Sequence, residues 1–311
     1  MVTENILFSS LTTLRIGGPI KYLVSAVSQD DIFRSIKKAK SENSPFVVIG
    51  GGSDLLVSDD GFSGYVVQNL LQGIEEHGGM IKVGSGTDLQ FLVGWAGEHG
   101  LSGFEKLAGI PGTVGGAVYG NAGAYGQVIS DYIVWVEVIS PDGKSERLRK
   151  EECRFGYRYS KFKKEKFTIL GVGFGGMPIK STGELKKTSM EIVETRLKKY
   201  PAGIACPGSF FKNVEIDNLS QDIVKNIPAD KIIYGKIPAG WLLEVVGAKG
   251  AVRGGVKIAE WHGNLFMNIG GGKARDFIEL AREQKRKVKE KFGIDLFPEV
   301  QFIGFEEEMV L

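Results

Sequence analysis

The chain has 311 residues, 42% of them hydrophobic, and its 39 Lys and Arg against 37 Asp and Glu give a formal net charge of +2. A chain of this length buries a large core and can form two or three domains, and so small a charge excludes the strong basic field of a nucleic-acid-binding protein. No apolar stretch reaches the ~18 residues of a membrane helix, and Met1-Val2-Thr3-Glu4-Asn5 does not open a secretory signal. We therefore expect a soluble, cytoplasmic protein without membrane insertion.

The cysteines and histidines indicate neither a disulfide nor a metal centre. Cys153 and Cys206 lie far apart and form no C-x-x-C pair, so we expect two reduced, partly buried thiols. His77, His99 and His262 have no H-E-x-x-H or similar spacing. We predict that the protein holds no metal.

The first seventy residues read as short strands with one helix. Helical spacing of apolar residues runs over 29–42, and Pro45 follows it. The apolar residues 46–49 then predict a buried strand that leads directly into Gly50-Gly51-Gly52.

The middle of the chain, from 80 to 177, reads as strand, helix, glycine-rich loop and strand. β-Branched residues predict the strands, and an amphipathic pattern predicts the helix. The strands are expected at 81–83, 133–139 and 168–172, and the helix at 88–99.

Two charged helices follow. The first, over 186–200, is ended by Pro201 and marks a hinge into a new domain. The second, over 274–292, has an apolar stripe, and we assign its basic face to solvent instead of nucleic acid. Because strands and helices do not alternate regularly, the sequence predicts an α+β fold.

Glycine is the residue type that carries most information about function. The 44 glycines are about twice the usual ~7%, and one cluster, GGGSDLLV at 50–57, follows a predicted strand, where successive N–H groups can bind a phosphate. It is not a Rossmann fingerprint, since Leu55 replaces the third glycine, and Gly272-Lys273 is not a Walker motif, since Ala274 follows. We favour a ligand loop over a tight structural turn.

The second cluster, LAGIPGTVGGAVYGNAGAYG at 107–126, holds seven glycines and almost no charge. A flexible linker would be polar, and a core strand would contain less glycine. Backbone lying against a large, flat, partly apolar ligand such as flavin isoalloxazine explains both features. Glycine-rich turns in a β-rich domain are the alternative.

These two loops, preceded by RIGGP at 15–19, resemble the FAD site of the UDP-N-acetylenolpyruvoylglucosamine reductases. That family has an FAD-binding domain of the vanillyl-alcohol-oxidase (PCMH) type in two lobes and a smaller α+β substrate domain. The resemblance continues through CRFGYRYS at 153–160, PGSFFKN at 207–213 and FPEVQFIG at 297–304, so it covers nearly the whole chain in order. The chain resembles the shorter branch, which lacks an extra tyrosine-bearing loop.

The resemblance implies a function. It is the NADPH-dependent, FAD-mediated reduction of the enolpyruvyl group of UDP-N-acetylglucosamine enolpyruvate to UDP-N-acetylmuramate, a step in peptidoglycan synthesis. Neither glycine-rich loop contains His or Cys, so we expect noncovalent FAD. Two alternatives stay open: another FAD-linked oxidase or dehydrogenase of the same FAD-domain class, and a non-catalytic flavin- or sugar-nucleotide-binding protein.

Three catalytic roles are implied by the resemblance. Arg158 matches the arginine that holds the substrate carboxylate, Ser209 matches the proton donor, and Glu299 matches a glutamate near the C-terminus. A bidentate guanidinium suits the dianionic enolate left by hydride addition. Glu299 helps only if it is protonated or balanced by Arg158, because a second negative charge would oppose the reaction.

The binding residues implied by the resemblance fall into two groups. The substrate-binding residues are Tyr157, Arg158, Gly208, Ser209, Lys212, Asn213 and Asn264. The cofactor-binding residues are Ile49, Gly50, Gly51, Gly52, Ser53, Leu55, Ala108, Gly109, Ile110, Pro111, Gly112, Thr113, Gly115, Gly116, Ala117, Asn121, Gly123, Ala124 and Tyr125.

Several positions depart from the family pattern, and two of them lie where ligand contacts are expected. Asp54 stands where the family usually has Asn, close to the expected pyrophosphate, and Trp261 stands where a basic residue is usual. We assign neither of them a ligand contact.

The resemblance also predicts how the chain is divided. The first FAD lobe is expected at 1–70 with the tail 296–311, the second lobe at 71–195, and the substrate domain at 200–295. We expect a monomer or a weak oligomer.

Overall fold

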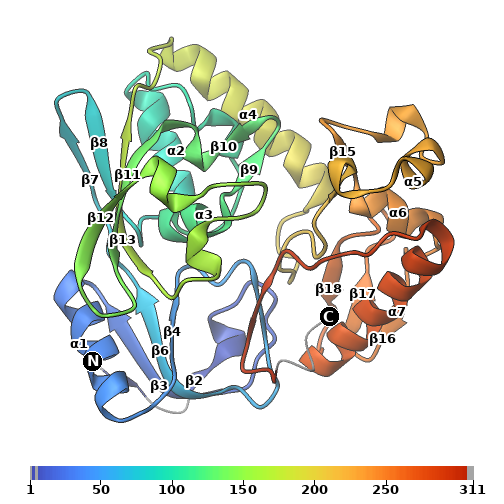
Figure 1. Cartoon of the computed structure of the whole chain (residues 1–311), viewed down its shortest axis with the longest axis horizontal. Helices are drawn as coiled ribbons and strands as arrows, with labels where there is room; N and C mark the ends of the chain where they lie inside the picture. Colours follow the sequence, from blue (N-terminus) through green and yellow to red (C-terminus); the bar gives the residue numbers. More distant parts are fainter. Residues whose placement is uncertain (1, 4–5, 307–311) are drawn as a thin grey trace. The chain divides into compact units, whose positions relative to one another are not determined.

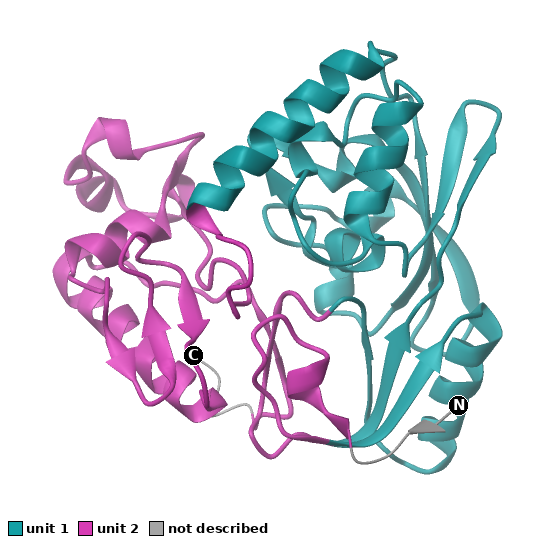
Figure 2. Ribbon diagram, turned by 180° about the vertical axis from the view of Figure 1, so that it is seen from behind, with its two compact units in different colours: residues 1–5, 20–51, 63–198 teal, residues 6–19, 52–62, 199–311 magenta. Residues whose placement is uncertain are grey.

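The computed structural model describes residues 2–3 and 6–306, which belong to two compact units (Figure 2). Unit 1 comprises residues 1–5, 20–51 and 63–198, and unit 2 comprises residues 6–19, 52–62 and 199–311. Both units are discontinuous in the chain. The division into three segments expected from the sequence stays a prediction.

One sheet of unit 1 carries helix α1 (Figure 1). Its strands β1, β3, β6 and β4 lie in that order, and α1 begins with a capping box between Ser28 and Asp31 and buries Ile32 and Ile36. The bounds are Val2–Thr3 for β1, Pro19–Ala26 for β3, Gln29–Ser41 for α1, Phe46–Ile49 for β4 and Phe62–Asn69 for β6.

The second sheet of unit 1 is antiparallel and has the order β12-β11-β13-β8-β7. The central strand β13 is buried from Thr168 to Phe174, and α2 and α3 contribute Leu92 and Val118 to the same core. The strands are β7 Ile74–His77, β8 Met80–Gly84, β11 Ile133–Ile139, β12 Ser145–Arg149 and β13 Thr168–Gly175. The helices are α2 Leu89–Glu98, α3 Val114–Gly120 and α4 Thr182–Lys199.

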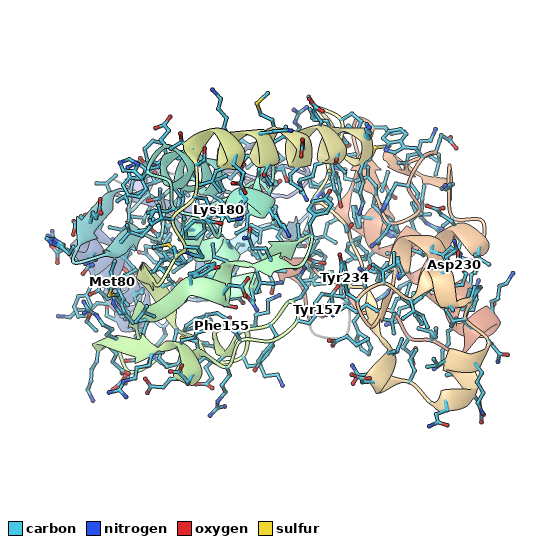
Figure 3. All side chains as sticks on the ribbon, turned by 90° about the horizontal axis from the view of Figure 1, so that it is seen from above. Met80, Phe155, Tyr157, Lys180, Asp230 and Tyr234 are labelled. Atoms are coloured by element: carbon cyan, nitrogen blue, oxygen red, sulfur yellow. The ribbon has the colours of Figure 1, made fainter. Side chains whose placement is uncertain are left out.

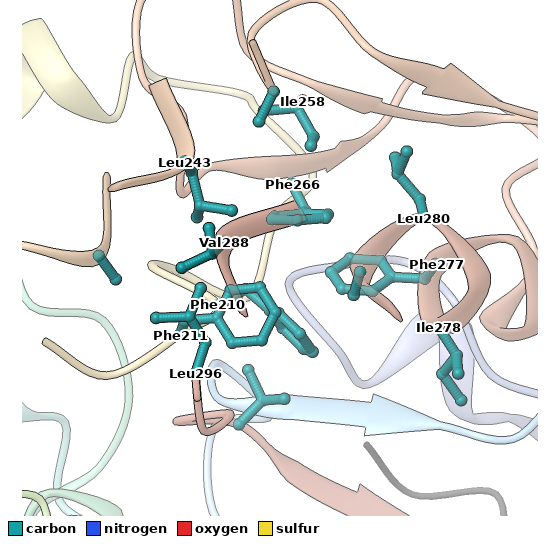
Figure 4. Close-up of a cluster of buried hydrophobic side chains, with 14 of the residues drawn as sticks. Phe210, Phe211, Leu243, Ile258, Phe266, Phe277, Ile278, Leu280, Val288 and Leu296 are labelled. Atoms are coloured by element: carbon teal, nitrogen blue, oxygen red, sulfur yellow. The ribbon is translucent and has the colours of Figure 1, made fainter. Parts of the chain in front are cut away.

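Unit 2 is organised around helix α7, whose apolar face packs on a cluster of phenylalanine rings (Figure 4). Phe277 of α7 has its ring centroid 4.9 Å from that of Phe210 and 5.3 Å from that of Phe266. The helices are α5 Gln221–Lys225, α6 Ala239–Val245 and α7 Ala274–Phe292. The strands are β2 Ile6–Leu7, β5 Leu55–Val57, β14 Val214–Glu215, β15 Lys236–Ile237, β16 Val252–Arg253, β17 Val256–Ile258, β18 Phe266–Asn268 and β19 Gln301–Ile303.

The start of α7 is capped by a residue from a distant part of the chain. Both carboxylate oxygens of Asp59 accept hydrogen bonds, from the backbone N–H groups of Ala274 and Arg275 at 2.9 and 3.2 Å. These N–H groups have no partner inside the helix. The carboxylate therefore ties the loop after β5 to the helix of the same unit.

Most of the predicted elements are confirmed, and one prediction was wrong. The helix expected at 274–292 has those bounds, while the helix expected at 186–200 begins at Thr182. The segment 107–126, expected to be a loop, contains helix α3 and the short strand β9 Gly123–Ala124, and strand β10 Gln127–Val128 follows it directly. Thr113 caps α3 at its start and Asn121 ends it in the left-handed conformation, so the caps compensate for the weak helix preference of the glycines.

Both cysteines are free thiols, as expected: Cys153 is buried and Cys206 is half-buried. Within residues 2–3 and 6–306, no helix has both the length and the apolar character needed to span a membrane.

Candidate active site

The two glycine-rich loops meet in unit 1. A Cβ atom placed on Gly50 would lie 2.3 Å from Oγ1 of Thr113, and one placed on Gly51 would lie 3.1 Å from Cα of Gly112. A side chain at either position would press on the second loop, so glycine favours this close approach. Gly50 and Gly51 are thus neighbours of Gly112 and Thr113, although the two pairs are about 60 residues apart in the sequence. All four residues were assigned to FAD.

A side chain that the sequence reasoning missed shapes the second loop. The amide of Gln90, on α2, accepts a hydrogen bond from the N–H of Gly109 at 2.6 Å and donates one to the carbonyl of Ile110 at 2.6 Å. Gly109 and Gly112 have φ values of +76° and +115°, which favour glycine. In the sequence, Gln90 could have been recognised as a polar residue among the mainly apolar residues of the predicted helix.

The loops fit a flavin dinucleotide in their chemistry. The stretch from Ala108 to Tyr125 contains no charged side chain, and Tyr125 is 41% exposed. Such a surface presents backbone N–H groups and an apolar face, which suit a pyrophosphate and a ring system. Of the predicted cofactor-binding residues, Gly52, Ser53 and Leu55 belong to unit 2, and the others belong to unit 1.

Arg158 lies in unit 1 at the tip of a tight turn. Gly156 and Tyr159 close the turn by two backbone hydrogen bonds of 2.9 and 3.2 Å, and Arg158 takes φ +52°. Its guanidinium donates a hydrogen bond from Nη2 to the carbonyl of Gly123 at 2.9 Å and lies 5.5 Å from the ring centroid of Tyr157 (labelled in Figure 3). Arg158 is therefore attached to the segment assigned to the flavin.

Ser209 and Glu299 are brought together in unit 2. The N–H of Glu299 donates to the carbonyl of Phe210 at 2.7 Å, and the N–H of Lys212 donates to the carbonyl of Phe297 at 2.9 Å. The segment after Ser209 and the segment before β19 thus run antiparallel. The resemblance assigned both residues to one site, and the structure adds the backbone hydrogen bonds that join the two segments.

The side chain of Asn264 also holds the segment that follows Ser209. Its amide is buried, and it donates to the carbonyl of Phe211 at 2.7 Å and accepts from the N–H of Phe211 at 2.9 Å. Ser209 itself forms a bridge with Leu265. The amide of Asn264, assigned to substrate, thus also fixes the backbone that carries Ser209.

A cavity of about 180 Å³ opens beside Ser209 in unit 2. Ser209, Asn213 and Asn264 line it, whereas Gly208 and Lys212, which were also assigned to the substrate, are not among its lining residues. The further lining residues are Lys199, Pro238, Gly240, Trp241, Glu244 and His262. None of these carried a motif that sequence reasoning could recognise.

His262 is kept neutral by its surroundings. Burial, with a smaller effect of the Lys199 ammonium, lowers the pKa of the imidazole to about 4. Nδ1 accepts a hydrogen bond from the N–H of Asn264 at 3.2 Å. A neutral ring is compatible with this acceptor role.

The lowered pKa of His262 predicts how stability depends on pH. The unfolded chain takes up a proton at this side chain below about pH 6.5, whereas the folded chain does so only near pH 4. Stability should therefore fall by roughly 1–2 kcal/mol between about pH 7 and about pH 4.5, allowing for partial solvent access. Denaturant unfolding of His262→Gln should lack this contribution, and the exposed His77→Gln should behave like the wild type. An equal pH dependence in all three proteins would contradict the prediction.

Comparison with known proteins identifies both parts of the chain. Residues 20–149 match the family model of an FAD binding domain, and residues 200–303 match that of the UDP-N-acetylenolpyruvoylglucosamine reductase C-terminal domain. The UDP-N-acetylenolpyruvoylglucosamine reductase of Solibacter usitatus is 40% identical over 297 residues, which are 95% of each chain. The chain belongs to the UDP-N-acetylenolpyruvoylglucosamine reductase family.

Other members of the UDP-N-acetylenolpyruvoylglucosamine reductase family agree in sequence and in fold. The reductase of Anoxybacillus flavithermus is 34% identical and covers 97% of this chain and 94% of its own. The crystal structure of the reductase from Thermus caldophilus superposes with a TM-score of 0.77 at 30% identity, over 97% of this chain and 100% of the other. The predicted family and the predicted α+β fold with an FAD-binding domain are confirmed.

The contact between the two loops predicts the effect of one substitution on FAD binding. In Gly50→Ala, the new methyl group and Oγ1 of Thr113 cannot both keep their positions. Either the loops separate or the Thr113 cap, worth ~1 kcal/mol, is lost, so the Kd for FAD should rise at least about fivefold. Flavin fluorescence titration of the apoprotein measures this. The control is Gly97→Ala, where the methyl group meets open space. If Gly50→Ala bound FAD as tightly as the wild type, the assignment of this loop to the FAD site would be wrong.

Proposed function

We propose that this chain catalyses the FAD-dependent reduction of the enolpyruvyl group of UDP-N-acetylglucosamine enolpyruvate to UDP-N-acetylmuramate, a step of peptidoglycan precursor synthesis. The observation that carries the proposal is that an FAD binding domain and the reductase C-terminal domain occur in one chain. The full-length similarity to proteins named as this reductase supports it. NADPH as the hydride donor follows from the resemblance to the family.

Each catalytic residue has one task in this proposal. The glycine-rich segments 50–57 and 107–126 would hold FAD, which would supply hydride transfer from NADPH to the vinyl carbon of the substrate. Arg158 holds the substrate carboxylate, and its planar cation stabilises the negative charge that develops beside that carboxylate. The hydroxyl of Ser209 gives its proton to the carbon next to the carboxylate. Glu299, whose backbone N–H donates to the carbonyl of Phe210 next to Ser209, is the third residue assigned to this step.

The proposed reaction also suggests where the enzyme works and in which state. We place it in the cytoplasm, where NADPH and nucleotide sugars are supplied, and we propose a monomer or a weak oligomer. Sedimentation at several protein concentrations measures the oligomeric state.

Separating the two half-reactions tests the proposed function. The FAD-loaded protein is reduced anaerobically with NADPH, excess NADPH is removed, and UDP-N-acetylglucosamine enolpyruvate is added while flavin absorbance is followed. We expect the oxidised flavin band to return without oxygen. Return only with oxygen would indicate an oxidase of the same FAD-domain class. Flavin that binds but is not reduced by NADPH would indicate a binding protein.

A further inference from the structure

The proposed proton donor has a second hydroxyl group beside it. The phenol oxygen of Tyr200 lies 2.8 Å from Oγ of Ser209, and both residues belong to unit 2. The distance is that of a hydrogen bond between two hydroxyl groups, in which either oxygen can donate. Tyr200 is not among the residues that the family resemblance assigns to the site.

The Tyr200 ring is held in place by the same strand region that holds Ser209. The ring packs on a cluster that contains Ala259, Leu265 and Met267. Ser209 forms its backbone bridge with Leu265. One segment of the chain therefore positions both hydroxyl-bearing residues.

Trp261 fixes the chain just before Tyr200. Its indole N–H donates to the carbonyl of Lys199 at 3.0 Å. This hydrogen bond gives a structural role to the tryptophan that departs from the family pattern. Trp261 thus anchors the backbone of Lys199, the residue directly before Tyr200, within unit 2.

The Lys199 ammonium packs against the Tyr200 ring. Its Nζ lies 5.0 Å from the ring centroid, a cation–π contact that helps to hold the ring in place. A phenol is a stronger acid than an aliphatic alcohol, so it can return a proton to an alkoxide.

We propose that Tyr200 is a positioning residue that orients the Ser209 hydroxyl and restores its proton; this inference rests on the proposed function. When the substrate carbanion takes the Ser209 proton, a C–H bond forms, the O–H bond breaks, and its electron pair stays on Oγ. The Tyr200 hydroxyl donates to that oxygen and transfers its own proton. The phenolate then takes a proton from water, which leaves both side chains as they began.

The variant Tyr200→Phe tests this inference, because it keeps the packed ring and removes only the hydroxyl. A hydrogen bond to an oxygen that becomes charged is about twice as strong as a neutral one, so flavin reoxidation at saturating substrate should slow roughly 10- to 100-fold. The rate of flavin reduction by NADPH and the substrate concentration that gives half-maximal reoxidation should be unchanged. The matched control is Tyr234→Phe, because Tyr234 is 80% exposed. Tyr234 is labelled in Figure 3.

A double-mutant cycle distinguishes action through Ser209 from a general structural effect. If Tyr200 acts through Ser209, adding Tyr200→Phe to Ser209→Ala should slow reoxidation no further. Equal slowing with and without Ser209 would overturn the inference. If Tyr200→Phe does not fold, Trp261→Phe replaces it and should slow the same half-reaction, since it removes the anchor of Lys199.

The experiment separates failure of the inference from failure of the proposed function. Absence of substrate-driven reoxidation in the wild type would reject the proposed function. Wild-type reoxidation that Tyr200→Phe matches in rate would leave the function standing and reject only the role of Tyr200.

Discussion

Replacing Ser209 by alanine is expected to slow the reoxidation of reduced flavin by substrate roughly 10²–10⁴-fold, the range typical of a lost general acid. The alanine variant has no proton at this position, so the substrate carbanion must wait for one from water. Reduction of the flavin by NADPH should keep its wild-type rate, because it does not use this proton. Stopped-flow absorbance of each half-reaction measures both rates separately.

The control for this variant is Ser41→Ala, at an exposed position at the end of α1. Both half-reactions should be unaffected there. Should Ser209→Ala reoxidise as fast as the wild type, the proton would come from another group, and the roles of Ser209 and Tyr200 would both be withdrawn.

Replacing Phe277 by alanine is expected to reduce the free energy of unfolding of the protein by about 3–5 kcal/mol. The Phe277 ring is fully buried, and it contacts the rings of Phe210 and Phe266. Removing it loses apolar burial and leaves a cavity that the rigid neighbouring rings cannot fill. Equilibrium denaturant unfolding, followed by circular dichroism, measures the change.

The matched control is Phe91→Ala, because Phe91 also lies on a helix but is 59% exposed. Its effect should be below about 1 kcal/mol, as for most surface substitutions. If Phe277→Ala cost no more than this control, the aromatic cluster would not be the main support of α7.

Local features of the sequence determined the elements and the family. The apolar spacing of α7 and of α1 recurs within one or two helical turns, and so it predicts these helices without tertiary information. The glycine clusters at 50–57 and 107–126 indicated two loops that lie against a ligand. The helix inside the second cluster was not predicted, because seven residues with several glycines have only a weak intrinsic preference for the helix. Its formation depends on the capping residues Thr113 and Asn121.

Only the tertiary structure decided which groups meet. The contact of Gly50 with Thr113, the bond between Asn264 and Phe211, and the hydroxyl of Tyr200 next to Ser209 involve residues with no shared motif. Whether Arg158 acts with Ser209 stays a prediction. Periodicity and capping are local properties of the chain, whereas these contacts depend on how distant segments pack against each other. The sequence thus determined the kind of protein and its loops, and packing determined the surroundings of the proposed proton donor.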